Sequence, residues 1–323
     1  MRVKLWGVRG SLPSPGLPDS FRFRLEDVLT QFERLKEAGV SISARAFVET
    51  LPPHLIGGYG GNTSCAEVNH GGARLLIDAG SGIRGFSDHI MRTVPATQEF
   101  HIYLTHFHWD HLIGLPFFVP MYIKGKTVHF YSVQEEMEEA LRTLFRKPFF
   151  PVPYESIQSQ VKVHRVAPRK PFRVGEINVT PYELDHPDPC WGIRVEAGGK
   201  ILAWSVDTEC TRSSREEMAE DAKLYYGADL MVFDAQYTFG EALEKINWGH
   251  SSGPTGIDVA IREEVKQAVF VHHDPGATDE MIRRAEEQTQ QYYEEILRMR
   301  KKSGMSAPDL RWHFAREGEE FQL

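Results

Sequence analysis

The chain has 323 residues, of which 41% are hydrophobic and 25% charged, a composition typical of a globular protein with a sizeable core. Its formal net charge of −8 argues against non-specific binding to nucleic acid, which depends on clustered Lys and Arg. No apolar run approaches the roughly 20 residues that a membrane-spanning helix needs, and the first residues lack the pattern of a signal peptide. The three cysteines are widely separated, which argues against a disulfide framework. We therefore expect a cytoplasmic protein.

The first half of the chain alternates predicted strands with glycine-rich turns. A strand at residues 3–8 leads into a Gly/Pro/Ser-rich loop, and residues 20–38 have the apolar spacing of an amphipathic helix. The glycine-rich sequences on either side of residues 17–56 look like two halves of one loop, so this segment is predicted to be a helical insertion. Further strands are predicted at 65–68, 73–77, 101–104 and 128–131, and further helices at 112–118 and 135–145.

The second half repeats this alternation and ends in a long helix. Strands are predicted at 161–166, 177–184, 191–195, 201–206, 230–233, 268–272 and 310–314, and helices at 215–225, 252–265 and 279–301. Two strand-rich halves with covering helices predict an α/β protein, a four-layer αββα sandwich of two mixed sheets packed face to face with outer helices. We expect a single domain over residues 1–323, with the insertion at about 17–56 and a C-terminal helix–strand extension at about 279–323.

Four side chains that can bind metal follow the predicted strand 101–104 within six residues. They are His106, His108, Asp110 and His111. Imidazole and carboxylate at this spacing suit zinc or a similar divalent ion, and a turn between a rigid strand and a helix can hold them still. A histidine-rich surface loop is the alternative, so the prediction requires further ligands elsewhere in the chain.

Later strands end in the side chains that this cluster needs. His186, Asp207 and His272 each stand at the carboxyl end of a predicted strand, as His106 does. Seven ligands that converge from strand ends could bind two metal ions and leave a face open to water.

The chain resembles the metallo-β-lactamase-fold hydrolases, whose H-x-H-x-D-H signature matches residues 106–111. The segments 6–11, 60–65 and 78–82 are similar to the branch that contains ribonuclease Z and the cyclic phosphate phosphodiesterases. The resemblance extends from Met1 to about Asp279, outside the insertion. It implies a metal-dependent hydrolase with two divalent metal ions, for which Zn²⁺ is the first choice and Mn²⁺ or Fe²⁺ the alternatives.

The resemblance also implies a role for each ligand. One ion would be held by His106, His108 and His186, the other by Asp110, His111 and His272, and Asp207 would bridge them. His273 competes with His272, and we favour His272 because the ligand in this family ends an apolar strand. Asp78, which opens a sharp turn, is predicted to be a buried acceptor that orients a ligand or loop, with a solvent-facing turn residue as the alternative.

The sequence Trp-Gly-His-Ser-Ser at residues 248–252 matches a motif that supplies a catalytic histidine outside the metal ligands in the ribonuclease Z branch. We therefore predict His250 as a catalytic residue, together with the ligand Asp110; a histidine packed below a serine-capped helix is the alternative. Weaker candidates for substrate contacts are Asn62, Thr63, Ser81 and Ser251, which turn chemistry explains about as well. The other histidines, His129 and His164 among them, are expected to be structural because they lack partners at ligand spacing, and His101 is expected to be structural because it begins the strand before the cluster.

These features predict a phosphodiesterase that cleaves a small or cyclic phosphodiester, such as a cyclic nucleotide, with a metal-bridged hydroxide as nucleophile. RNA 3′-end processing like that of ribonuclease Z is an alternative, but the sequence shows no basic arm of the kind that grips tRNA in that enzyme. The segment 17–56 carries mixed charge and could instead be a lid or a dimer contact. A non-catalytic metal-binding sensor or scaffold is a third alternative, against which the complete ligand set argues. The expected partner is a small phosphodiester, with nucleic acid disfavoured, no membrane contact, and a homodimer left open.

Overall fold

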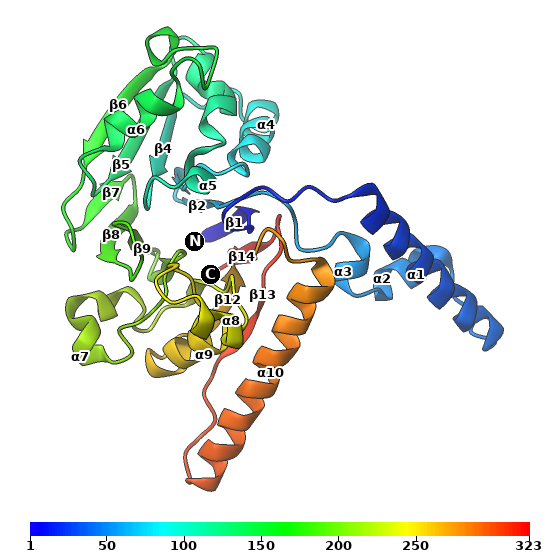
Figure 1. The fold of residues 1–323 in the computed structure, drawn as a ribbon. Coiled ribbons are helices and arrows are strands. Elements are labelled where there is room, and N and C mark those ends of the chain that lie inside the picture. Colours follow the sequence, from blue (N-terminus) through cyan, green and yellow to red (C-terminus); the bar gives the residue numbers. More distant parts are fainter.

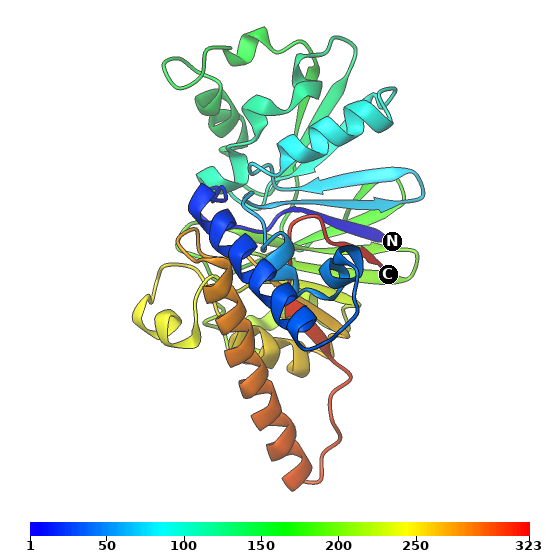
Figure 2. The same cartoon turned by 90° about the vertical axis from the view of Figure 1, so that its right-hand side faces the viewer.

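The computed structural model describes residues 1–323, apart from the side chain of Pro53. Over these residues the chain forms two seven-stranded sheets that pack face to face (Figures 1 and 2). The first sheet has the order β14 (Glu320–Gln322), β1 (Arg2–Gly7), β2 (Cys65–His70), β3 (Ala73–Ile77), β4 (Glu99–Tyr103), β5 (Thr127–Ser132) and β6 (Gln160–Arg165). The second has the order β13 (Arg311–Phe314), β12 (Gln267–Val271), β11 (Leu230–Asp234), β10 (Lys200–Ser205), β9 (Trp191–Ala197), β8 (Ile177–Glu183) and β7 (Phe172–Val174).

Both sheets are mixed, as predicted. Strands β3 to β6 and β10 to β13 pair in parallel, whereas β14 to β3 and β7 to β10 pair antiparallel. Burial along β1 alternates because one face of this strand meets the core, whereas every residue of β11 is buried. Full burial of β11 is typical of a central strand that is covered on both faces.

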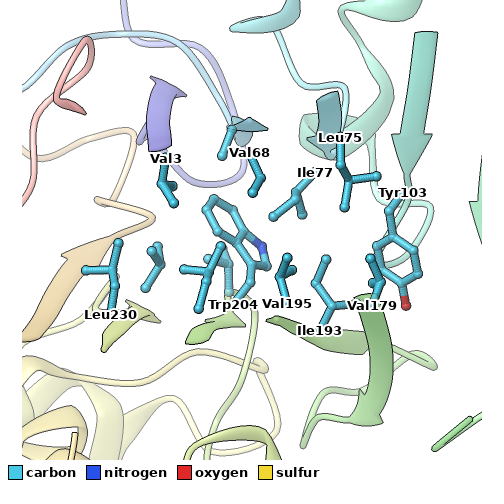
Figure 3. Close-up of a cluster of buried hydrophobic side chains, with 14 of the residues drawn as sticks. Val3, Val68, Leu75, Ile77, Tyr103, Val179, Ile193, Val195, Trp204 and Leu230 are labelled. Carbon is cyan, nitrogen blue, oxygen red and sulfur yellow. The ribbon is translucent and has the colours of Figure 1, made fainter. Parts of the chain in front are cut away.

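The space between the sheets is filled by apolar side chains from both of them. Trp204 on β10 is 1% exposed and lies among Val3, Val68 and Ile77 of the opposite sheet (Figure 3). Burial of each such aliphatic side chain contributes roughly 1.5–3 kcal/mol to folding, so this layer fixes the two sheets against each other. The strand ends that carry the predicted ligands are therefore held on a rigid frame.

Helices cover the outer face of each sheet (Figure 1). On the first sheet, α4 (Ile83–Thr93) and α6 (Met137–Leu144) bury residues such as Phe86 and Leu141 in one apolar cluster. On the second, α9 (Gly253–Arg262) and α10 (Asp279–Lys302) do the same with residues such as Ile257 and Ile282. The order helix, sheet, sheet, helix confirms the predicted four-layer αββα sandwich.

Two predicted helices are wrong in detail. Residues 112–118 form no apolar helix: α5 (Trp109–Leu112) is followed by the 3₁₀ turns η1 (Leu115–Phe117) and η2 (Val119–Tyr122). Pro116 and Pro120 lack the N–H group that a continuing helix requires. Residues 215–225 divide into α7 (Arg215–Met218) and η4 (Ala219–Leu224), because Ala219 has a positive φ of 48°. The shorter elements α8 (Phe239–Glu244) and η3 (Tyr154–Ser156) complete the helices outside segment 17–56.

Segment 17–56 forms the helices α1 (Pro18–Glu37), α2 (Ala44–Thr50) and α3 (Pro53–Ile56), which stand beside the start of α10 (Figures 1 and 2). Among the described side chains, α1 has no buried residue, so the predicted apolar face is exposed. Its Arg24 donates a 3.1 Å hydrogen bond to Asp279, which ties α1 to α10.

The last segment, predicted as an extension from about residue 279, supplies an edge strand to each sheet through β13 and β14. It is therefore built into the sandwich rather than appended to it. Within the described part of the chain, the helices lack the combined length and apolarity that crossing a bilayer requires.

Candidate metal centre

The seven predicted ligands come together from the ends of four strands. The cluster of residues 106–111 follows β4, His186 follows β8, Asp207 follows β10 and His272 follows β12. Asp207 and His272 have positive φ angles of 66° and 63°, a conformation that is uncommon for residues other than glycine. Such backbone strain is often found at functional sites. Here the chain bends sharply directly after β10 and β12, and the bend directs the side chains of Asp207 and His272 toward the site.

Ligand atoms from these residues form two groups, within each of which all atoms lie within 4.8 Å of one another. The first group is His106, His108, His186 and Asp207, and the second is Asp110, His111, His272 and Asp207. Asp207 belongs to both, because its Oδ1 lies 3.1 Å from Nε2 of His111 and 3.0 Å from Nε2 of His272, while its Oδ2 lies 3.5 Å from Nε2 of His106. This is the division that the resemblance implies.

Several atoms in these groups are buried without a partner. Among the described residues, Nε2 of His106, Nε2 of His111 and Oδ1 of Asp207 make no hydrogen bond, although each residue is at most 1% exposed. A buried polar atom without a hydrogen bond lowers the stability of the folded protein by roughly 1–3 kcal/mol, so such atoms are rare outside functional sites. Lone pairs that converge on a common point are what a divalent cation requires, and these residues therefore fit a pair of metal ions.

Other side chains hold the ligands in place. Oδ2 of Asp78 lies 2.8 Å from Nδ1 of His111, and its Oδ1 accepts hydrogen bonds from N and Oγ1 of Thr105 at 3.0 and 2.9 Å. Asp78 is fully buried, so its contacts are those of the orienting acceptor that the sequence predicts rather than those of a surface turn. His186 is held in the same way, with Nδ1 3.1 Å from the carbonyl oxygen of Gly249.

His250 lies beside the second group and is oriented by Asp234, a residue that no sequence-based prediction included. Nδ1 of His250 lies 2.9 Å from Oδ2 of Asp234, and its ring stacks on His272 with centroids 4.9 Å apart. Since a carboxylate only accepts, Nδ1 carries the proton and Nε2 is left for a substrate. The signal for Asp234 was present, because it ends the apolar strand β11 much as Asp207 follows β10.

A family comparison decides the identity of this arrangement. The Beta-lactamase superfamily domain matches residues 73–273, more than half of the chain. The chain belongs to this superfamily. The predicted family and fold are thereby confirmed, and the protein is a metal-dependent hydrolase of the metallo-β-lactamase fold with His and Asp groups that could bind metal.

Individual relatives are distant. Ribonuclease BN of Cronobacter sakazakii is 29% identical over 137 residues, which cover 39% of this chain and 40% of that protein, so the match spans less than half of the relative's length. Among solved structures, a diphosphatase from the PhnP family has a TM-score of 0.59 and 17% identity over 100% of this chain and 97% of that chain. Yeast PDE1 has a TM-score of 0.60 and 11% identity over 100% and 99%. At these identities the structures share the fold alone.

The electrostatics of the hydrolase centre favour bound positive charge. Burial lowers the pKa of His272, but the carboxylates of Asp207, Asp110 and Asp234 outweigh burial and raise this pKa to about 9. Burial also lowers the pKa of His111, but the carboxylates of Asp207 and Asp110 outweigh this effect and raise the pKa well above its ordinary value. Buried carboxylates thus hold protons on two imidazoles when no metal is bound, and a metal ion would take over that charge.

The stability of the metal-free hydrolase is expected to fall as pH rises from 6.5 to 9, between the ordinary and the raised pKa of His272. A raised pKa stabilises the folded protein fully below the ordinary value, and this stabilisation disappears as pH passes the raised value. Thermal unfolding with EDTA and with Zn²⁺ at both pH values tests this expectation. A metal-free melting temperature that rises with pH would contradict it, and the metal-loaded protein, which needs no proton on His272, is the control.

The weaker candidates for substrate contacts are engaged with one another. Ser81 Oγ accepts from N of Thr63 at 3.0 Å and donates to Oδ1 of Asn62 at 2.9 Å, and Ser81 N donates to Oγ1 of Thr63 at 2.9 Å. These contacts favour the structural alternative for all three residues. Ser252, not Ser251, is the N-cap of α9, and the buried Oγ of Ser251 has no partner among the described residues, so Ser251 stays a candidate.

His273 lies apart from both groups of ligand atoms. Its Nε2 donates to the carbonyl oxygen of Ala315 at 2.9 Å, and its ring stacks on Phe314. Burial lowers the pKa of His273 to about 3, so the ring is neutral and packed in the protein. The geometry therefore agrees with the choice of His272 as the ligand.

Proposed function

We propose that this hydrolase is a dinuclear phosphodiesterase that acts on a small or cyclic phosphodiester. The position of Asp207 between two groups of ligand atoms carries the proposal, because one carboxylate can hold two ions together only where both groups share it. Zn²⁺ is the metal that the donor set favours, with Mn²⁺ or Fe²⁺ as alternatives. Two such ions would supply a Lewis acid for a phosphoryl oxygen and would activate a water molecule as a nucleophile at neutral pH.

The remaining residues position the reactants. Asp110 is fixed by the backbone N of Ser11, which donates to its Oδ2 at 2.8 Å, and by His272, whose Nε2 lies 3.1 Å from the same oxygen. We assign to the doubly protonated ring of His250 the transfer of its Nε2 proton to the leaving alkoxide, which leaves a neutral ring whose remaining proton, on Nδ1, faces Asp234. The proton released when the attacking water is ionised balances the proton that the alkoxide takes up, so the ring of His250 regains its Nε2 proton over one turnover.

An apolar cavity beside the loop of residues 106–111 supports a substrate with a flat aromatic group. The cavity has a volume of about 640 Å³ and is lined in part by Phe107, Trp109, Phe117 and Phe149. Phe107 and Trp109 alternate with the predicted ligands of residues 106–111, so the cavity adjoins the loop that carries these ligands, although none of the ligands lines it. Aromatic walls of this kind suit a nucleobase, which supports a cyclic nucleotide as the substrate.

RNA 3′-end processing is the second candidate, and the similarity to ribonuclease BN favours it. Helix α1 projects from the sandwich (Figure 1), as an arm that grips RNA would. Its charge argues against this role, since α1 carries four basic and five acidic side chains. A grip on RNA depends on neutralising phosphates, so the smaller substrate is preferred.

Turnover of a substrate panel tests the proposal. The panel holds bis(p-nitrophenyl) phosphate, 2′,3′- and 3′,5′-cyclic nucleotides, a tRNA precursor, a thioester and a lactone. We expect at least one cyclic nucleotide to be hydrolysed, EDTA to abolish the activity, and Zn²⁺ or Mn²⁺ to restore it. Cleavage of the tRNA precursor without hydrolysis of any small phosphodiester would favour the second candidate. Turnover of only the thioester or lactone would contradict both.

A further inference from the structure

Three histidines expected to be structural lie side by side on adjacent strands of the first sheet. His101 on β4 pairs directly with His129 on β5, and their rings stack with centroids 4.6 Å apart. The ring of His164 on β6 stacks on the other side of His129 at 5.2 Å. Glu99 is the first residue of β4, whereas the metal centre follows the last residue of this strand. The cluster is therefore separate from the ligands described above.

Three of these residues have the geometry of a metal site. Glu99, His101 and His129 each offer one ligand atom, and these atoms lie within 4.8 Å of one another. Nε2 of His129 lies 4.0 Å from Oε1 of Glu99, and among the described residues this buried nitrogen has no hydrogen-bond partner. His129 is only 9% exposed, so solvent does not readily satisfy the nitrogen. A buried lone pair that faces a carboxylate and a second imidazole requires an explanation.

The opposite nitrogen of each ring is held by a neighbouring side chain. Nδ1 of His101 lies 3.0 Å from the hydroxyl of Tyr131, and Nδ1 of His129 lies 2.9 Å from Nε2 of His164. Metal-binding histidines are oriented in this way, because a partner on one nitrogen aims the other at the ion. Burial lowers the pKa of His129 and lowers that of His101 to about 4, so both rings are neutral near pH 7. The neutral ring is the form that binds metal.

We propose that Glu99, His101 and His129 form a peripheral site that binds one divalent transition-metal ion. Two imidazoles and one carboxylate are a donor set that suits Zn²⁺, and His164 and Tyr131 act from outside it by orienting the rings. The carboxylate side of the site is open, since the side chain of Glu99 is 62% exposed. Water completes the coordination there, and the ion exchanges with solvent without opening the sandwich.

Zinc stoichiometry tests the peripheral site. The full-length protein is saturated with Zn²⁺, and bound zinc per chain is measured at equilibrium for the wild type and for His129→Phe, which keeps a stacked ring but removes the ligand. The same pair is compared in the Asp207→Ala background, where the main centre is weakened. We expect one ion fewer per chain in His129→Phe in both backgrounds, with turnover of a phosphodiester unchanged in the otherwise wild-type protein.

Two further variants keep the test decisive if His129→Phe folds poorly. Glu99→Gln alters an exposed side chain and is expected to weaken zinc binding at this site roughly tenfold or more. His313→Phe is the matched control, because it removes another strand histidine that contacts a glutamate, Glu319, at 2.9 Å. It should leave the stoichiometry unchanged. Equal zinc per chain and equal affinity in the wild type, His129→Phe and Glu99→Gln would overturn the proposal.

Discussion

Replacement of the proposed bridging carboxylate in Asp207→Ala is expected to lower turnover by roughly three orders of magnitude or more and to remove at least one ion from the proposed metal centre. The side chain is 1% exposed and belongs to both groups of ligand atoms, so its loss leaves each group incomplete. It also removes the negative charge that would screen two bound cations from each other. Turnover of a phosphodiester and metal content by mass spectrometry are measured on the same preparation.

Asp229→Asn provides the matched control for this loss. Asp229 is a largely buried acid directly before β11, but it pairs with Lys200 and Lys266 rather than with the proposed ligands. The control variant should lose some thermal stability while it keeps the metal content and turnover of the wild type. If Asp207→Ala also kept both ions and full turnover, Asp207 would not bridge the centre and the proposed mechanism would be wrong.

His250→Ala is expected to lower turnover of a cyclic nucleotide by roughly 10²–10⁴-fold while the metal content stays that of the wild type. The predicted loss reflects the missing proton for a poor leaving group, because His250 supplies that proton from a ring held by Asp234. Bis(p-nitrophenyl) phosphate releases a stable phenolate that needs little protonation. The loss on this activated substrate should therefore be much smaller.

The dependence of the lost turnover on the leaving group distinguishes a catalytic role of His250 from a packing role. Asp234→Asn removes the acceptor for Nδ1 but keeps the imidazole, so it should lower turnover by roughly 10–100-fold and alter the pH profile. A loss that is equal on both substrates would indicate a packing role for His250. Loss of metal in His250→Ala would make His250 a ligand, since Asp234, His250 and His272 form another group of suitable geometry.

The convergence of the proposed metal ligands was predictable, because each of these residues has a recognisable position in the local sequence. An apolar strand followed by a histidine or aspartate marks His186, Asp207 and His272, and parallel strands bring their carboxyl ends to one edge of a sheet. The same rule applies to Asp234, which was missed because no recognised motif surrounds it. The two-sheet architecture followed from the same alternation of strands and covering helices.

Contacts across neighbouring strands were not predictable from the sequence. His101 and His129 are 28 positions apart, and only the register of β4 against β5 brings them together. The amphipathic pattern of α1 likewise predicts a helix but not a partner for its apolar face, of which Phe21 is 64% exposed. The spacing of apolar residues in the sequence predicts which face of a helix is apolar, whereas only the tertiary structure shows what covers that face.

The dinuclear centre is tested most directly by anomalous diffraction from crystals of the zinc-loaded protein. We predict two anomalous peaks roughly 3.5–4 Å apart on either side of Asp207. One peak should contact the group of His106, His108 and His186, and the other the group of Asp110, His111 and His272. A single peak that does not contact Asp207, or no peak among these residues, would contradict the assignment of a shared two-metal site.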